Sequence, residues 1–246
     1  MSLETLKPPL RRFRIYRALR FAWHFATDRV FRRDYLRRLR PARGQFQFRS
    51  FTREERYPRI FAFLGERLAA RADARVLSFG CATGEEAFSL RRRLPQAFIK
   101  GVDVNALDIA VAERRRAAEG AAGERMEFTC AADAAGESAD SYDAVLCLAV
   151  FQHSALKDEA RESCAAFIRF GDFERVLGGL ARCLKPGGYL AFRWANFRFE
   201  DAACASDFEP VLTLPPGGAP HPRFDRDNRR LAAEPDRQVV WRKRGG

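Results

Sequence analysis

Short apolar segments alternate with amphipathic segments from residue 75 onward, and this alternation constrains the fold more than any other feature of the chain. The apolar segments have the length of buried strands, and the segments between them carry apolar residues at the three- and four-residue steps typical of helices. We expect strands at residues 75–79, 97–102, 126–129, 142–148 and 189–194, helices at residues 85–93, 107–118 and 173–183, and late strands at residues 208–214 and 238–242. Because strands that alternate with helices pair in parallel, the chain predicts an α/β fold with a doubly wound, Rossmann-like, mostly parallel sheet.

The segment before the first strand carries the whole positive charge of the chain. Residues 1–75 contain 20 Lys and Arg against 7 Asp and Glu, whereas the remaining residues have a net charge of −1. Apolar residues at three- and four-residue steps predict helices over residues 3–40 and 59–71. We therefore expect two parts, a basic helical arm or lid over residues 1–70 and an α/β domain over residues 71–246.

Composition excludes several classes of protein. No apolar run approaches the roughly 18–20 residues of a membrane span, and arginines interrupt the start of the chain too often for a signal peptide. The six cysteines include no Cys-x-x-Cys pair and lie mostly in apolar surroundings, which indicates reduced thiols in a cytoplasmic protein. The three histidines are too scattered to indicate a metal site, so we expect no metal.

The loop between the first strand and the next helix indicates a ligand at the carboxyl edge of the sheet. Residues 80–86 read Gly-Cys-Ala-Thr-Gly-Glu-Glu. A dinucleotide fingerprint, Gly-x-Gly-x-x-Gly, requires glycine where the chain has Ala82 and Glu85. Two acidic residues at a helix N-terminus also repel a pyrophosphate, and a phosphate-binding loop requires a following Gly-Lys-Ser or Gly-Lys-Thr. Both phosphate-binding interpretations therefore fail.

Residues 76–86 resemble the first motif of class I S-adenosylmethionine-dependent methyltransferases, in the form found in chemotaxis receptor methyltransferases. Ala82 stands where the family pattern has its second glycine. The resemblance continues at the family's spacing through an acidic residue after the second strand, a segment after the third, and the segments 143–148 and 184–190. It covers about residues 75–194 and implies a class I methyltransferase domain with S-adenosylmethionine as cofactor.

The resemblance assigns a role to individual residues. Asp103 would accept the ribose hydroxyls, Val104 would flank the adenine, and Glu85 would face the ammonium group of the methionine portion. Asp103 as a helix N-cap and Glu85 as a first-turn acid are the alternatives that need no cofactor. The cofactor-binding residues expected together are Gly80, Cys81, Ala82, Gly84, Glu85, Asp103, Val104, Ala132, Asp133 and Leu148.

The sequence restricts the methyl acceptor without identifying it. His153 lies just past the fourth strand, where a histidine near neutral pKa is a candidate general base. The segment 148–151, Leu-Ala-Val-Phe, lacks the Asn/Asp-Pro-Pro-Tyr/Phe motif of nucleic-acid amino-methylating enzymes and the Arg-Asn pair of chemotaxis enzymes. We therefore expect methylation of oxygen or nitrogen on a small-molecule or glycolipid-like acceptor.

The basic arm leaves three interpretations open. An Arg-rich amphipathic helix can lie on an anionic membrane, bind RNA phosphates, or cover the cofactor site as a lid. The missing nucleic-acid motif makes nucleic acid the less favoured partner, and peripheral membrane contact through residues 1–43 stays open. A rival hypothesis of another class is a non-catalytic module that keeps the fold and binds RNA or an anionic membrane through the arm.

Overall fold

The computed structural model describes residues 14–28, 31–32, 35–36, 44–47, 52–156, 161–215, 221–232 and 237–245. The chain forms two compact units, Met1–Pro41 and Ala42–Gly246. The first unit contains the helix α1 (Arg14–Thr27), and the second contains the sheet with the remaining helices. Among the described helices, none combines the length and the apolar character that a membrane span requires.

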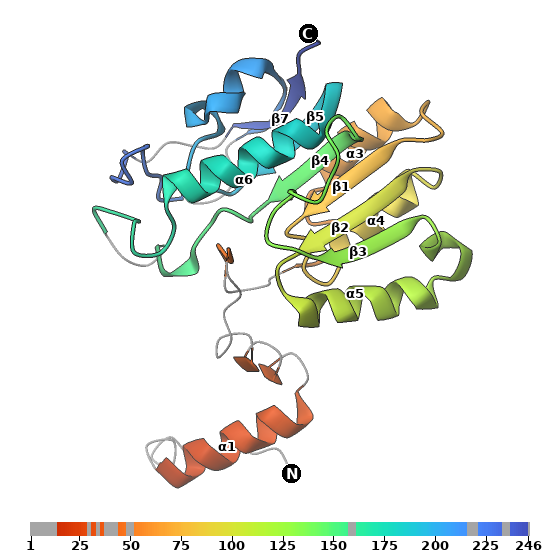
Figure 1. The fold of residues 1–246 in the computed structure, drawn as a ribbon. Helices are drawn as coiled ribbons and strands as arrows, with labels where there is room; N and C mark the ends of the chain where they lie inside the picture. The colour runs from red at the N-terminus through yellow and green to blue at the C-terminus, as the bar shows by residue number, and fades with distance from the viewer. Residues whose placement is uncertain are drawn as a thin grey trace. The chain divides into compact units, whose positions relative to one another are not determined.

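The second unit is built on one seven-stranded sheet in the order β3-β2-β1-β4-β5-β7-β6 (Figure 1). The strands are β1 (Arg75–Phe79), β2 (Phe98–Asp103), β3 (Met126–Cys130), β4 (Tyr142–Leu148), β5 (Leu184–Arg193), β6 (Phe208–Thr213) and β7 (Gln238–Lys243). The first five pair in parallel, whereas β7 is antiparallel to both β5 and β6. The predicted α/β, mostly parallel sheet is confirmed.

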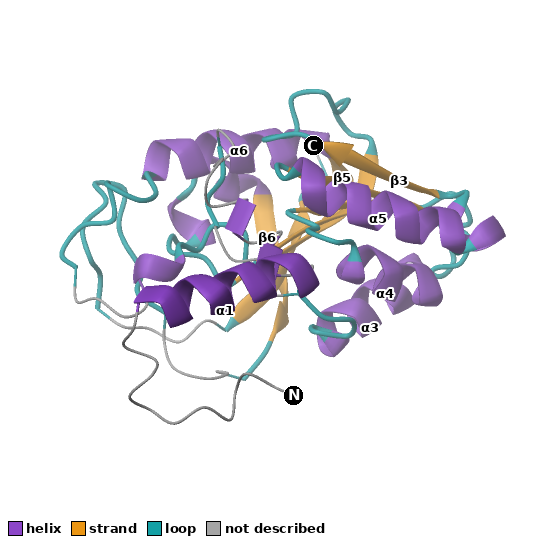
Figure 2. Ribbon diagram, turned by 90° about the horizontal axis from the view of Figure 1, so that it is seen from below, coloured by secondary structure: helices purple, strands orange, loops and turns teal. Residues whose placement is uncertain are grey.

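Helices cover both faces of this sheet, as its buried strands require. The helices α3 (Pro58–Leu68), α4 (Glu85–Arg93) and α5 (Ala106–Ala118) bury their apolar residues in one core cluster. The helix α6 (Phe170–Cys183) packs on the other face with the 3-10 turns η5 (Phe199–Asp201) and η6 (Ala203–Asp207). Figures 1 and 2 show α6 on the side of the strands opposite α3 and α4.

The chain order of the strands creates a binding crevice. Chain connections run from β1 to β2 on one side, whereas β4 lies on the other side of β1. At such a switch point the loops that leave β1 and β4 diverge, and open α/β sheets bind ligands outside the carboxyl ends of these strands. The loop after β1 and the segment after β4 both lie at this edge.

The structure corrects three predicted boundaries. The fifth strand begins at Leu184 instead of residue 189, because Leu184 pairs with Tyr142. The pairing then resumes at Tyr189 with Ala144, and the Lys-Pro-Gly-Gly segment lies in the register shift between the two pairs. The helix α6 begins three residues earlier than predicted, where the Phe170 amide donates to Asn228 Oδ1 at 2.7 Å. The helix expected over residues 3–40 is interrupted after α1, where Asp28 Oδ1 accepts from the Phe31 amide at 3.0 Å; much of the remainder of that range lies outside the described residues.

Candidate cofactor site at the carboxyl edge of the sheet

The loop after β1 has the backbone of a glycine loop even where it lacks glycine. Gly80 and Gly84 have φ angles of 71° and 91°, and Ala82 between them has a φ of 50°. A non-glycine residue in this left-handed region costs about 1–3 kcal/mol, and such strain gathers at functional sites. Ala82 therefore departs from the family pattern in side chain but keeps the conformation that the glycine would have.

Asp103, the last residue of β2, holds the loop after β1 in place by a hydrogen bond. Its Oδ2 accepts a hydrogen bond from the Ala82 amide at 2.9 Å, and its Oδ1 accepts one from the Asn105 amide at 2.8 Å. Each carboxylate oxygen has a second lone pair, so both can also accept a ribose hydroxyl. The structure thus brings Asp103 to the loop at residues 80–84. The N-cap of α5 is Asn105, whose own side chain accepts from the Leu107 amide.

The two adjacent acids after Gly84 have different environments. Glu85 Oε1 accepts from the Thr83 hydroxyl at 2.6 Å, whereas Glu85 Oε2 is buried and has no hydrogen-bond partner among the described residues. Glu86 is buried in the interior, and burial raises the pKa of its carboxyl to about 8. Because a buried carboxylate oxygen almost always has a donor, Glu85 fits the ammonium group of a methionine portion and Glu86 does not.

The residues expected around the adenine lie at the ends of β2 and β3. Val104 is partly exposed, and its carbonyl accepts a hydrogen bond from the Cys130 thiol at 3.5 Å. Ala132 is also partly exposed. Asp133 accepts from the Ala135 amide and from Arg175 Nη1, both at 3.0 Å, and the Ala135 hydrogen bond keeps the pKa of Asp133 below its usual value. The Asp133 carboxylate is therefore already engaged within the protein.

The segment after β4 contacts the loop after β1. Leu148 is 3% exposed, and the next residue, Ala149, has a φ of 59°. A Cβ on Gly80 would lie 2.4 Å from Val150 Cγ2, so only glycine allows this approach. Cys81 is buried beneath the loop, and burial raises the pKa of its thiol well above the usual value.

His153 is buried, and both its backbone amide and its ring are hydrogen-bonded. Its amide donates to Asn196 Oδ1 at 2.7 Å, and its Nδ1 accepts from the Ala155 amide at 3.3 Å. Burial lowers the pKa of the imidazole below 6.5, so the ring is neutral at pH 7. Because Nδ1 accepts, the ring proton is on Nε2 in this arrangement. A role as general base at Nε2 requires the other tautomer.

Two segments before α3 belong to this edge of the sheet, and the sequence indicated them only weakly. Phe46 is 8% exposed, and its ring lies 4.8 Å from that of Phe151 in an edge-to-face contact. Between residues 44–46 and 165–175 lies a hollow of about 340 Å³. The sequence signals were a polar-aromatic stretch at residues 45–48 and, for the second segment, a loose resemblance of residues 51–55 to the substrate-side segment of chemotaxis methyltransferases.

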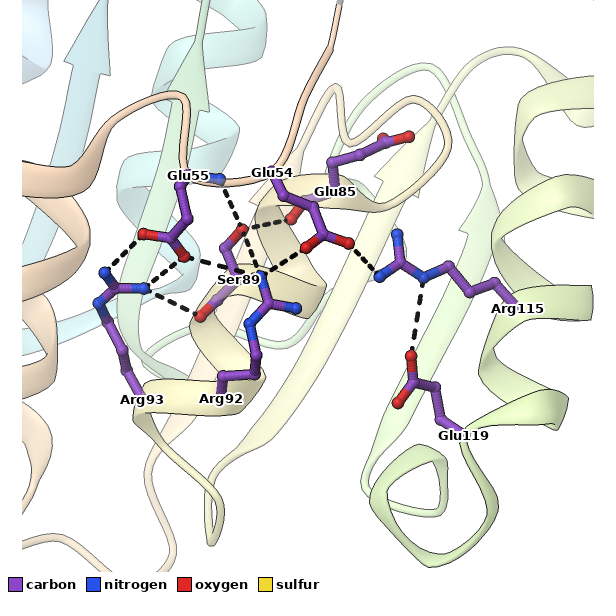
Figure 3. Close-up of polar contacts among 8 residues, drawn as sticks. All are labelled: Glu54, Glu55, Glu85, Ser89, Arg92, Arg93, Arg115 and Glu119. Carbon is purple, nitrogen blue, oxygen red and sulfur yellow. Dashed lines mark hydrogen bonds and ion pairs between the residues drawn. The ribbon is translucent and has the colours of Figure 1, made fainter.

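The second segment, residues 52–57, is tied to α4 and α5 by ion pairs (Figure 3). Glu55 pairs with Arg93 at 2.5 Å, and the Glu55 amide donates to Ser89 Oγ at 3.1 Å. Glu54 pairs with Arg92 at 2.8 Å and with Arg115. Hydrogen bonds from Arg115 and Arg93 hold the pKa values of Glu54 and Glu55, respectively, below the usual range. These contacts hold the start of α3 against the helix that begins with the cofactor loop.

The strand order of the sheet, together with the loop at residues 80–84 that hydrogen-bonds Asp103, is typical of the class I methyltransferase fold. Residues 77–190 match the family model described as a methyltransferase domain. This match covers 114 of the 246 residues, from β1 into β5. Among the described residues, no group of three or more His, Cys, Asp or Glu side chains is placed to hold a metal ion.

Several solved structures are similar to this chain, and the first of those that follow shows the fold. The YcgJ protein from Bacillus subtilis is 13% identical with a TM-score of 0.50, over 77% of this chain and all of that chain. The cyclase SpnF is 26% identical with a TM-score of 0.41, over 54% of this chain and 43% of that chain. A Haemonchus contortus phosphoethanolamine N-methyltransferase in complex with S-adenosylhomocysteine is 23% identical with a TM-score of 0.40, over 57% of this chain and 28% of that chain. The chain thus spans less than half of the last two proteins, and no curated protein matches its sequence.

Proposed function

We propose that this chain is an active S-adenosylmethionine-dependent methyltransferase that methylates oxygen or nitrogen of a small-molecule or glycolipid-like acceptor. One observation carries the proposal. The amide of Ala82, in the loop after β1, donates to the carboxylate of Asp103, at the end of β2. The protein thus holds a strained loop and an acid in one fixed geometry, which supports binding of a nucleoside with an amino-acid tail at this edge.

The protein's task in this reaction is mainly alignment. S-adenosylmethionine supplies an electrophilic methyl group with a good leaving group, so the enzyme holds donor and acceptor in line and excludes water. Asp103 would accept the ribose hydroxyls, and Glu85 Oε2 would accept from the ammonium group. The Leu148 to Val150 segment would shield the reacting atoms, because it lies against Gly80.

Two experiments test the proposal. Calorimetry of the chain with S-adenosylmethionine should show saturable binding, and absence of binding at millimolar ligand would refute the enzyme hypothesis. Cell extract with a labelled methyl donor should then show label in one fraction among lipid, RNA, protein and small molecules. Label in the small-molecule or lipid fraction supports the proposed acceptor class, and label in RNA or protein would contradict it.

The pH dependence of turnover tests His153 as the base. Because burial lowers its pKa, the neutral ring persists below pH 6.5, and the acid limb of kcat/KM should lie below that value. The variant His153→Gln should lose this limb and about 10²–10⁴-fold in rate, the usual contribution of a general base. An unchanged profile in the variant would remove His153 from the chemistry.

The exposed apolar stripe of α1 favours a membrane as a second partner. Ile15, Leu19 and Trp23 are spaced four residues apart and are 75%, 63% and 56% exposed. Phe21 and Phe25 stack at 5.8 Å on another part of the same helix. An apolar stripe with arginines beside it can lie in the headgroup region of an anionic bilayer.

The full chain should therefore sediment with vesicles that contain 30% anionic lipid. Binding should fall in 0.5 M salt, because the attraction is electrostatic. Leu19→Glu should abolish binding without changing cofactor affinity. Equal binding to neutral vesicles would contradict the proposal, and salt-sensitive binding to RNA but not to vesicles would favour the rival RNA-binding module.

A further inference from the structure

The side chain of Arg193, at the carboxyl end of β5, has no hydrogen-bond or ion-pair partner among the described residues. Side chains alternate along a strand, and Tyr189 and Ala191 belong to the core cluster on the side of α3 and α4, so Arg193 faces the same side. It pairs in register with Leu148, the last residue of β4. Arg193 Nε is buried and unsatisfied, although the residue as a whole is partly exposed.

Tyr57 brings a second unsatisfied donor to the same place. It is the N-cap residue of α3 and is 6% exposed, and its hydroxyl is buried without a partner among the described residues. Burial raises the pKa of this hydroxyl, while the nearby charges of Arg56 and Arg193 oppose that rise. The ring of Phe63 in α3 lies 5.5 Å from that of Tyr189 in β5, so α3, which begins after Tyr57, packs on the face of the sheet that Arg193 shares. Because nearly all buried polar groups are hydrogen-bonded, two buried donors without a protein partner can both donate to an acceptor group of a ligand.

The positive charge of Arg193 favours an anionic ligand beside Arg193 and Tyr57. The guanidinium of Arg193 is always charged, and it lies over the indole of Trp194, 5.0 Å from the ring centre. Trp194 has a φ of 61°, which is uncommon for a bulky residue. Residues with such strained backbone angles occur most often at functional sites. Burial raises the pKa of Glu86, the acid that acts on Tyr57, to about 8, so at pH 7 it is mostly protonated and does not repel an anion.

The position in the sheet separates this site from the cofactor loop. β1, β4 and β5 are consecutive in the sheet, and neighbouring strands lie about 4.8 Å apart, so Arg193 is roughly 10 Å across the sheet from Gly80. Arg193 is thus two strands away from the loop that would hold the methionine portion. The strand ends at Leu148 and Arg193 lie side by side, so this place adjoins the segment after β4.

We propose that Arg193 and Tyr57 bind an acidic group, a carboxylate or a phosphate, on the methyl acceptor. The inference rests on the proposed function, because it takes the acceptor to lie beside the cofactor. The methionine carboxylate of the cofactor has the same chemistry, and the experiment must therefore separate the two sources.

Anion binding to the protein saturated with S-adenosylhomocysteine tests the proposal. The probes are benzoate and phenyl phosphate, with benzamide as the neutral counterpart, and the readout is calorimetry or ligand-observed NMR. We expect wild-type protein to bind at least one anion at least 10-fold more tightly than benzamide. Arg193→Gln should remove this preference, and Tyr57→Phe should reduce it about three-fold or more. Both variants should keep their affinity for S-adenosylhomocysteine within two-fold.

The matched control is Arg242→Gln. Arg242 is half exposed on β7 and pairs in register with Tyr189, near the opposite end of β5, so this variant should keep the preference for anions. Tyr57→Phe removes a hydroxyl that has no partner among the described residues and should fold normally, which keeps the test valid if Arg193→Gln is unstable.

Equal binding of anions and benzamide would overturn the proposal. A 10-fold loss of S-adenosylhomocysteine affinity in Arg193→Gln would also overturn it, by assigning the arginine to the cofactor's carboxylate. Failure of the wild type to bind S-adenosylhomocysteine would refute the proposed function instead.

Discussion

Replacing Asp103 by alanine is expected to weaken binding of S-adenosylhomocysteine by roughly 30- to 1000-fold, which corresponds to about 2–4 kcal/mol. A hydrogen bond to a charged group is worth about 1.5–3 kcal/mol, and in its proposed role the carboxylate would accept two from the ribose. The substitution also releases the Ala82 amide from its 2.9 Å hydrogen bond, so the strained loop loses its anchor. Calorimetry at pH 7 measures the effect.

Two further variants separate the role of Asp103 from general damage to the site. Asp103→Asn keeps one acceptor oxygen and should bind with intermediate affinity. Asp133→Ala removes a carboxylate that the Ala135 amide and Arg175 already engage, so it should change the affinity less than three-fold. A larger loss for Asp133→Ala than for Asp103→Ala would show that the adenine side dominates binding and that the ribose assignment is wrong.

Much of the sheet could be predicted from the sequence because its strands are buried on both faces. Residues 75–79 and 142–148 form β1 and β4 with the predicted boundaries. A short, mostly apolar segment between loop residues is typical of a strand that is buried on both faces of a parallel sheet. Boundaries that depend on distant partners could not be predicted. The start of α6 is set by Asn228, which lies 58 residues later in the chain.

In the candidate site, too, local features could be predicted from the sequence, whereas features that depend on packing could not. The loop at residues 80–84 is a local feature, and its glycine spacing indicated the turn directly. The family resemblance favoured Glu85, but the sequence carries no physical reason for that choice, because only packing buries Glu86 in the interior and leaves an oxygen of Glu85 without a donor. Arg193 gave no signal, since an arginine that ends an apolar strand resembles any solvated strand end. The role of each residue toward the cofactor stays a prediction for the binding experiments.

Asp143 offers the largest expected effect on stability. Its side chain is 3% exposed, and it accepts from Arg71 at 2.5 Å, from the Arg75 amide at 2.9 Å and from Lys185 at 2.9 Å. Asp143→Ala should lower the free energy of unfolding by about 2–4 kcal/mol, because it leaves a backbone donor and two cations without their shared partner. The lower part of the usual range for a broken buried ion pair applies, since Arg71 and Lys185 are 46% and 35% exposed and can be solvated. Urea unfolding at pH 7 measures the change.

The pH dependence of this stability has a definite sign. Burial acts to raise the pKa of Asp143, but hydrogen bonds from Lys185, the Arg75 amide and Arg71 overcome it and lower the pKa. A lowered folded-state pKa contributes stability above the unfolded value of about 3.9 and loses it as the pH falls through the folded value. The gap between wild type and Asp143→Asn should therefore be full at pH 7 and should narrow below about pH 4.

Asp140→Asn is the matched control for this gap. Asp140 is 55% exposed, pairs with Lys243 at 3.1 Å and has a φ of 48°, which asparagine tolerates. An exposed pair contributes about 0–1 kcal/mol, so the control should stay within that range at every pH. Asp143 also lies near the amino end of β4, opposite the cofactor edge, so both variants should bind S-adenosylhomocysteine within three-fold of wild type. A gap that is constant from pH 3 to pH 7 would show that packing around Asp143, and not its charge, stabilises the fold.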